Sequence, residues 1–339
     1  MESFRQESGS DRKVALIGKL IMRQDIRLTK TILGCCMSSV EERDLAEVRM
    51  IEEGFRKAYD GDAKGVADAF SSLRDFAVQL IHLDITAEHE LDAKALIIAM
   101  GDIGRMTAEK GMEIASIASV RSLGEVAVEA ADQKRESLAL KALSGLGGLA
   151  LELAGKGMDA VARNAAESLG NIGKESARAK MEVLASLSEI YLMQLSMKAM
   201  EENLSETRDA AVNLLGEIGA SSAGKEMENS AVGAAILLEE LGTAAVRKRD
   251  EPQVEIVIQT LGKLGKALDR QDSKNALVQI VWALETLRVL ALEYEMETAV
   301  AAGKLALESL STAGVPDDEQ NLEKIQEIMD FHQRILRRN

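Results

Sequence analysis

Few side chains in this sequence could do chemistry, and they form no familiar catalytic set. The 339 residues include three histidines (His82, His89 and His332) and two adjacent cysteines (Cys35 and Cys36). Because no histidine lies between His89 and His332, the sequence offers no Ser/His/Asp or Cys/His arrangement for nucleophilic catalysis. A structural zinc site needs four ligands in spaced pairs, which two adjacent cysteines do not supply. We therefore predict no catalytic residue, no cofactor and no metal ion, and interpret the cysteines as a buried helical pair rather than a redox-active one.

Two stretches match binding motifs only in part. Residues 60–71 begin like an EF-hand calcium loop, with Asp60, Asp62, Gly65 and Asp68 in place. Lys64 occupies a ligand position, however, and Ser71 stands where a bidentate glutamate is required. Residues 145–150 satisfy the pattern G-x-G-x-x-A, which binds a dinucleotide only between a strand and a helix. Neither calcium nor a dinucleotide is expected to bind.

A 23-residue sequence repeat predicts the secondary structure in which most of these residues lie. From Met100 onward leucine recurs without insertion at Leu123, Leu146, Leu169, Leu192, Leu215, Leu238, Leu261, Leu284 and Leu307. A fixed period of this size is typical of a repeat array, in which each unit buries its apolar face against its neighbours. With the leucine as position 0, positions −4, +3 and +8 are also small or apolar with one exception, Asp269, which fits the 3.6-residue period of a helix. Since the chain has only two prolines, the sequence predicts an all-α protein.

Each unit is predicted to be one helix of about 18 residues followed by a turn of about five. Position −10 is mostly acidic, as expected where a helix begins and its dipole favours negative charge, and position +11 is polar or glycine throughout. Glycine recurs at +1 and +4, either because neighbouring backbones approach closely or because the +4 glycine ends the helix. We favour close packing, because the apolar pattern continues to +8.

Helices of two kinds alternate, so the true repeat is a pair of about 46 residues, within the range of HEAT and armadillo repeats. Position −2 reads Ile98, Ser144, Ile190, Ile236 and Trp282 in one set, and Arg121, Glu167, Asn213, Gln259 and Leu305 in the other. The first set is mostly apolar and the second mostly polar. The second kind of helix is therefore amphipathic.

Two segments carry a family resemblance. Residues 161–173 (VARNAAESLGNIG) and 207–219 (TRDAAVNLLGEIG) resemble the packing helix of HEAT-like repeats, especially those named after phycobilisome lyases. Arg208 falls where that family places an arginine, while Ala162 occupies the site in the other segment. The resemblance implies a right-handed α-solenoid of antiparallel helix pairs, here with about 14 helices. Such repeats mostly belong to scaffolds and adaptors, so we expect a non-enzymatic protein–protein interaction scaffold.

Enzymes built on similar repeats are a less favoured alternative. His89–Glu90 resembles the His-Glu pairs with which deoxyhypusine hydroxylase, a HEAT-like metalloenzyme, holds two irons. This chain has a single such pair, so the required ligand set is missing. No Cys or His cluster in the repeats supports a bilin lyase.

The ends of the chain depart from the register and are predicted to be caps. We expect a helical cap over residues 1–62, the repeat array over 63–317 and a capping helix over 318–339. Helices are expected near 13–36, 40–59 and 63–82. No charged and apolar leader opens the sequence, and no apolar run is long enough to span a bilayer. We therefore expect a cytoplasmic protein.

The acidic charge restricts the class of partner. The net charge is −15 and the isoelectric point about 4.9. Nucleic acids and anionic membranes are poor partners for such a chain, because their binding depends on neutralising phosphates. A basic protein or peptide stays open as a partner, although acidic charge also simply keeps proteins soluble.

Two candidate surfaces follow from the two kinds of helix. The first is a polar ladder for a protein or peptide partner: Arg163, Glu167, Asn171, Asp209, Asn213, Glu217, Glu255, Gln259 and Lys263. An ordinary solvated face is the alternative interpretation of that ladder. The second is an apolar sector that could join copies into a homo-oligomer: Ile190, Tyr191, Met197, Ile236 and Trp282. Contiguous apolar surface usually marks an interface, although burial under the N-terminal helices or between helices would also account for these residues.

Overall fold

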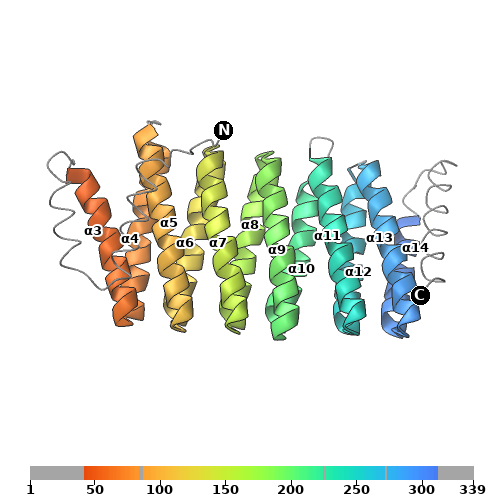
Figure 1. Ribbon diagram of the computed structural model, residues 1–339. Coiled ribbons are helices and arrows are strands. Elements are labelled where there is room, and N and C mark those ends of the chain that lie inside the picture. Colours follow the sequence, from red (N-terminus) through yellow and green to blue (C-terminus); the bar gives the residue numbers. More distant parts are fainter. Residues whose placement is uncertain (1–41, 84–86, 224–226, 272, 312–339) are drawn as a thin grey trace, which may run out of the picture. The chain divides into compact units, whose positions relative to one another are not determined.

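Residues 42–83, 87–223, 227–271 and 273–311 are described by the computed structural model (Figure 1). They form twelve α-helices and no strand, which confirms the all-α prediction for this part of the chain. The helices are α3 (Glu42–Asp60), α4 (Ala63–His82), α5 (Ala87–Glu109), α6 (Glu113–Asp132), α7 (Glu136–Gly155), α8 (Asp159–Arg178), α9 (Glu182–Glu202), α10 (Ser205–Ser221), α11 (Glu228–Arg247), α12 (Glu251–Asp269), α13 (Lys274–Glu293) and α14 (Glu297–Ser311).

The chain divides into two compact units, unit 1 (Met1–Ser168) and unit 2 (Leu169–Asn339), and each shows the same packing pattern. In unit 1, α4 packs against α5 and α6, and α5 packs against α6 and α7. In unit 2, α10 packs against α11 and α12, and α11 packs against α9, α12 and α13. Within each unit the even-numbered helices thus form one layer and the odd-numbered helices another. This alternation is that of an α-solenoid of helix pairs, and it confirms the two-helix repeat.

The recurring leucines lie in the packed interior. Met100 and the leucines from Leu123 to Leu284 have no exposed surface, and Leu307 is half-buried. The helices α6, α7, α11 and α12 begin at the acidic position −10, as predicted. Half of the described helices have 20 residues, and the commonest turn has three, so the predicted 18 and five placed the helix end too early. The helix continues beyond the apolar site at +8.

A left-handed residue at position +11 closes the helices. Gly111, Lys134, Gly157, Lys180, Asn203, Arg249 and Glu295 all have φ between 55° and 72°. After α6 the Lys134 N–H donates to the Ala131 carbonyl over 2.9 Å, and the Arg135 N–H donates to the Ala130 carbonyl over 2.7 Å. This Schellman pair satisfies carbonyls that the helix leaves free, and it explains why +11 is glycine or a flexible polar residue.

The repeated glycines permit close packing. A Cβ atom on Gly216, at +1 of α10, would lie 2.3 Å from Cγ2 of Thr260 on the next even helix. A Cβ atom on Gly219, at +4, would lie 2.7 Å from Cβ of Ala234 on the neighbouring odd helix. Both glycines lie inside α10. Close approach is therefore correct, and the alternative of a helix end at +4 is wrong.

Carboxylates at position −10 also join successive helices of one layer. Oε1 of Glu228 accepts from the Asn275 N–H over 3.2 Å, at the start of α13. Oε1 of Glu251 accepts from the Thr298 N–H and Oγ1, both over 2.9 Å, at the start of α14. The hydrogen bonds from Thr298 hold the pKa of Glu251 below its ordinary value. The acidic residue at position −10 thus begins its own helix and also caps the first turn of the corresponding helix in the next repeat.

The helices expected near 40–59 and 63–82 are confirmed as α3 and α4. Gly61 takes a positive φ of 77° in the turn between them, and Oδ1 of Asp62 accepts from the Gly65 N–H over 2.9 Å to cap α4. The EF-hand-like residues are therefore the end of one helix and the cap of the next. The G-x-G-x-x-A residues lie inside α7. The helices expected at 13–36 and after residue 318, and the adjacent cysteines, lie outside the described residues, and the domain boundaries stay a prediction.

Candidate functional site

The polar ladder lies on three even helices, α8, α10 and α12. Arg163 and Glu167 belong to unit 1 and the other seven residues to unit 2. Seven of its nine residues are exposed, and Asp209 and Glu255 are half-buried. Within each unit the structure thus places these residues in contact with solvent.

Most side chains of the ladder already have partners within the chain. Arg163 pairs with Glu167 over 3.4 Å, and Lys174 pairs with Glu217 over 2.8 Å. The Gln259 amide donates to Glu255 over 3.0 Å, and the Asn213 amide donates to the Asp209 carbonyl over 2.9 Å. Groups paired in this way gain little from exchanging these partners for those of another protein. The geometry favours a solvated face here.

The apolar sector is more distinctive. Ile190, Ile236 and Trp282 occupy position −2 of α9, α11 and α13, one repeat apart, and we call these three residues the outer row. Ile190 is 39% exposed and Ile236 is 40% exposed, while Trp282 is half-buried. Because two of the three reach solvent to this extent, burial between the helices does not account for the outer row.

The same register position in the even layer provides a direct control. Asn213 on α10 and Gln259 on α12 also stand at position −2 and are also exposed. Solvent therefore reaches position −2 in both layers of unit 2. The odd layer fills it with large apolar side chains on three successive helices, whereas α10 and α12 of the even layer carry amides there and only α14 carries an apolar residue, Leu305, which is 67% exposed. An exposed position does not require an apolar residue. The outer row is therefore a stronger candidate than the polar ladder for contact with another protein.

Further apolar residues border the outer row. Tyr191 and Met197, predicted with it, are half-buried on α9. Val183, one helical face with Ile190, is 58% exposed, and Val289 on α13 is half-buried. Val183 and Val289 extend the surface in both directions along the helices. The sequence pattern gave no reason to separate Val183 from an ordinary helix-start residue.

A buried carboxyl group lies beneath this surface. Glu189 on α9 is 1% exposed, and its Oε1 accepts from Oγ of Ser230 on α11 over 2.9 Å. Oγ of Ser230 in turn lies 3.0 Å from Oγ of Ser222. Burial raises the pKa of Glu189 to about 8, against the smaller opposing effect of the Ser230 hydrogen bond. The carboxyl group is therefore protonated at neutral pH and joins α9 to α11 without a charge.

Acidic groups also border the outer row on α11 and α13. Glu239 is half-buried, and burial raises its pKa in spite of a hydrogen bond from Thr286. Glu240 is exposed one turn after Ile236. Glu285 pairs with Arg288 over 2.6 Å. The surface is thus apolar in the middle and acidic along one side.

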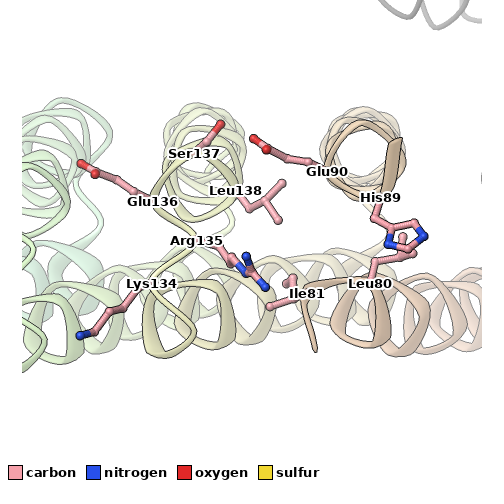
Figure 2. A pocket seen from close by; sticks show the side chains of 9 residues that line it. All are labelled: Leu80, Ile81, His89, Glu90, Lys134, Arg135, Glu136, Ser137 and Leu138. Atoms are coloured by element: carbon pink, nitrogen blue, oxygen red, sulfur yellow. The ribbon is translucent and has the colours of Figure 1, made fainter. Parts of the chain in front are cut away.

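A pocket of about 200 Å³ lies in unit 1, where α4, α5 and the turn from α6 to α7 meet (Figure 2). Its lining residues are Leu80, Ile81, His89, Glu90, Lys134, Arg135, Glu136, Ser137 and Leu138. Figure 2 shows Glu90 pointing toward Ser137 and His89 pointing toward Leu80, so the two side chains do not converge on one point. A hydrogen bond and ion pair from Lys94, 2.8 Å away, hold the pKa of Glu90 below its ordinary value.

The geometry of the pocket gives the His-Glu pair a structural explanation. Glu90 stands at position −10 of α5 and is hydrogen-bonded by Ser137 at the start of α7, in the register of the caps described above. Among the described residues, no group of three or more His, Cys, Asp or Glu side chains is arranged to hold a metal ion. The pair therefore belongs to the column of repeat caps.

Comparison with known proteins adds little. No protein-family model matches the chain, and no curated protein matches it. One similar solved structure is described as a circular tandem repeat protein with novel repeat topology and enhanced subunit contact surfaces. It is 15% identical with a TM-score of 0.33, over 94% of this chain and 87% of that chain. A likeness at this level carries no information on function.

Two helices of the described part, α7 and α13, are long and apolar enough to cross a membrane by length and composition alone. Core helices of soluble proteins meet the same two conditions. Both helices pack against neighbours within their own units. Their composition reflects the apolar odd layer.

Proposed function

We propose that the protein is a non-enzymatic scaffold of the HEAT/armadillo kind that binds another protein through the outer row. The observation that carries the proposal is the contrast at position −2 between the odd helices α9, α11 and α13 and the even helices α10 and α12. Exposed Ile190 and Ile236 in the odd layer stand where the even layer has exposed Asn213 and Gln259. A partner that covers the outer row would remove this apolar surface from water.

The chemistry of the outer row also suits a contact of this kind. Isoleucine and tryptophan are large, and tryptophan is enriched among the residues that contribute most to binding. The three residues are anchored on packed helices, so little side-chain ordering is required when a partner binds. These properties support binding in place of catalysis.

Quantitative affinity purification from the native host tests the proposal. We expect the full chain carrying Ile236→Asp to lose a partner that the wild-type chain captures, by at least about tenfold in affinity, the equivalent of about 1.4 kcal/mol. Ile236 is exposed, so the substitution leaves the helix intact. The matched control is Glu217→Lys, an exposed substitution on the polar ladder. Loss of the partner with Glu217→Lys but not with Ile236→Asp would transfer the contact to the ladder and overturn the proposal.

Self-association is the second candidate function, because an apolar row can also pair with another copy of the chain. Light scattering over a range of concentrations separates the two. A mass above that of one chain, restored to one chain by Ile236→Asp, would make the homo-oligomer the function of this surface. A monomer at every concentration would remove it.

A further inference from the structure

Two neighbouring carboxylates on α11 border the outer row without a cation beside them. Glu239 is half-buried and is held by neutral groups, since it accepts from Nε2 of Gln279 over 3.5 Å and from the Thr286 hydroxyl. Glu240 is exposed and forms no ion pair with any residue that the structure describes. Burial and, to a smaller extent, the charge of Glu240 raise the pKa of Glu239. A cation placed here would offset the cost of burying that charge.

The opposite side of the outer row is apolar. Leu187, Val232 and Val278 lie three or four residues before it on α9, α11 and α13, and each is half-buried. An extended peptide lying over these side chains would leave backbone N–H and C=O groups unpaired. A helix pairs its backbone groups internally and needs only one apolar face. The surface therefore favours a helical occupant with an apolar face and with cations along one flank.

A second copy of this surface does not supply those cations. Pairing through a twofold axis places the same patch on both sides of the contact. Within seven residues of the outer row on α9, α11 and α13, Arg288 is the one cation. It is already held by Glu285, to which its Nε donates over 2.8 Å and its Nη2 over 2.6 Å. Glu239 and Glu240 would stay without a cation in such a dimer, so twofold self-pairing does not fit this surface.

The spacing of the three odd helices sets the spacing of the occupant. Neighbouring packed helices lie about 8–10 Å apart, and seven residues of a helix span about 10 Å at 1.5 Å per residue. We propose, resting on the proposed function, that the outer row binds a basic amphipathic helix of a partner protein. This helix crosses α9, α11 and α13 with apolar residues seven apart against the outer row, and its lysine or arginine side chains pair with Glu239 and Glu240.

Trp282 reports directly on this surface, because it is the one tryptophan of the chain and lies in the outer row. The probe is a synthetic helical peptide without tryptophan, about 21 residues long so that it can cross three packed helices. It carries leucine on one face and lysine along one flank, and we call it the lysine peptide. Added to the full chain, it should shift Trp282 emission to shorter wavelength and reduce quenching by acrylamide. Unchanged Trp282 emission at about 1 mM lysine peptide would overturn the proposal.

Matched peptides test the charge and the helix separately. The glutamate peptide has glutamate in place of each lysine, and the proline peptide has prolines in the middle, which break the helix. Each should bind the full chain at least about tenfold more weakly than the lysine peptide. Equal affinity for the glutamate peptide would show that Glu239 and Glu240 take no part. Equal affinity for the proline peptide would show that the surface takes an extended segment, and either result overturns the proposal.

Charge reversal on α11 tests the pairing from the side of the protein. The full chain carrying Glu240→Lys should bind the lysine peptide about three- to tenfold more weakly, and the glutamate peptide more tightly, than the wild type does. The matched control is Glu217→Lys, which changes the net charge equally but lies on α10, and it should bind both peptides as the wild type does. Circular dichroism and the thermal midpoint establish that both variants are folded. Equal losses in the two variants would show that the peptide responds only to overall charge, which overturns the proposal.

Failure of this inference and failure of the proposed function are distinguishable. If the lysine peptide leaves Trp282 unchanged while Ile236→Asp still abolishes capture of a host partner, the proposed function stands and the partner does not present a basic helix. If Ile236→Asp loses the lysine peptide but captures the host partner normally, the outer row accepts a basic helix and the captured partner binds elsewhere. A dimer that Ile236→Asp dissociates, in a chain that does not bind the lysine peptide, would assign the outer row to a second copy.

Discussion

The two layers of unit 2 share one register but use it differently. At position +1 the even helices α10 and α12 carry Gly216 and Gly262, whereas the odd helices α9, α11 and α13 carry Met193, Glu239 and Glu285. At position +1 the even helices therefore meet their neighbours without a Cβ atom, and position −2 of α10 and α12 is polar. The odd helices carry larger and partly polar side chains at position +1, and their position −2 is apolar. One repeat pattern thus supports one layer that packs through glycine at position +1 and one layer that presents an apolar row at position −2.

The two layers differ because different side chains lie between neighbouring helices of each layer. Glycine at +1 removes the Cβ atom, so the Thr260 side chain on α12 packs directly against the backbone of α10 at Gly216. In the odd layer a buried carboxyl group, Glu189, takes part in the contact between α9 and α11 and is held by one hydroxyl hydrogen bond. A buried polar group of this kind costs free energy unless it is neutral and hydrogen-bonded. Glu189 therefore makes the contact between α9 and α11 dependent on pH.

The largest expected effect is a pH dependence that Glu189 imposes on folding. Its pKa rises from an ordinary 4.5 to about 8 in the folded protein, so the folded state holds this proton more tightly than the unfolded state. Below about pH 4.5 Glu189 is protonated in both states, so it adds no pH dependence to the free energy of unfolding there. Between the two pKa values the free energy of unfolding should fall by about 1.4 kcal/mol per pH unit from this group, and the loss is complete above the folded pKa.

Urea unfolding of wild type and Glu189→Gln from pH 5 to 9 measures this dependence. Glutamine keeps an acceptor for Ser230 and cannot ionise, so the variant should gain stability over the wild type as pH rises. Glu201→Gln, an exposed substitution on the same helix, serves as the control and should run parallel to the wild type. Parallel curves for Glu189→Gln would show that the carboxyl group is solvated, and the expected pH dependence of the contact between α9 and α11 would be wrong.

The next effect compares glycine to alanine in the two layers. In the even layer, Gly216→Ala places a methyl group 2.3 Å from Cγ2 of Thr260, so Thr260 must move and its 3.3 Å hydrogen bond to Asn213 is lost. We expect a loss of about 1–3 kcal/mol in the free energy of unfolding. In the odd layer, Gly148→Ala on α7 of unit 1 meets no atom within 4 Å and should gain about 1 kcal/mol from helix propensity.

Opposite signs for one chemical change would establish that the close packing at Gly216 has no counterpart at Gly148. Denaturant unfolding with both variants in the same buffer measures it. If Gly216→Ala also stabilises the protein, α10 and α12 have room to separate, and the close packing inferred at position +1 is wrong.

Much of this fold follows from sequence because a repeat reports the same fact many times. The leucine column fixed the register, and the acidic column at −10 fixed most helix starts to the residue. The helix ends were placed less well, since the left-handed residue at +11 is a backbone property that lysine, asparagine and arginine meet as well as glycine does. The bonds from Glu228 and Glu251 to the next repeat join residues far apart in sequence, and no local pattern distinguishes such a cap from an ordinary acidic helix start.

The candidate surface was only partly predictable. Periodicity gives the angle of Ile236 around its own helix but not which neighbour covers it, so its exposure had to come from the structure. The sequence does contain an indication that Glu189 is buried, but it lies at position −3 of the repeat, whereas our comparison used position −2. Position −3 holds Ile97, Val120, Leu143, Ala166, Val212, Ala235, Ile258 and Val281 in the other units of the described array up to α13. One carboxyl group in an apolar column indicates a buried polar group.

The smallest expected effect concerns the outer side of the even layer. Glu217 pairs with Lys174 over 2.8 Å, but the Glu217 side chain is exposed, and an ion pair in water contributes less than about 1 kcal/mol. Glu217→Gln should therefore change the free energy of unfolding by only a few tenths of a kcal/mol, and 1 M salt should remove the difference, since it screens exposed charges within about 3 Å. Thermal unfolding at low and high salt measures this. A loss of more than about 2 kcal/mol in the free energy of unfolding, or a loss that salt leaves intact, would mean that the polar ladder also holds the even helices together. Glycine at position +1 would then not account by itself for the packing within the even layer.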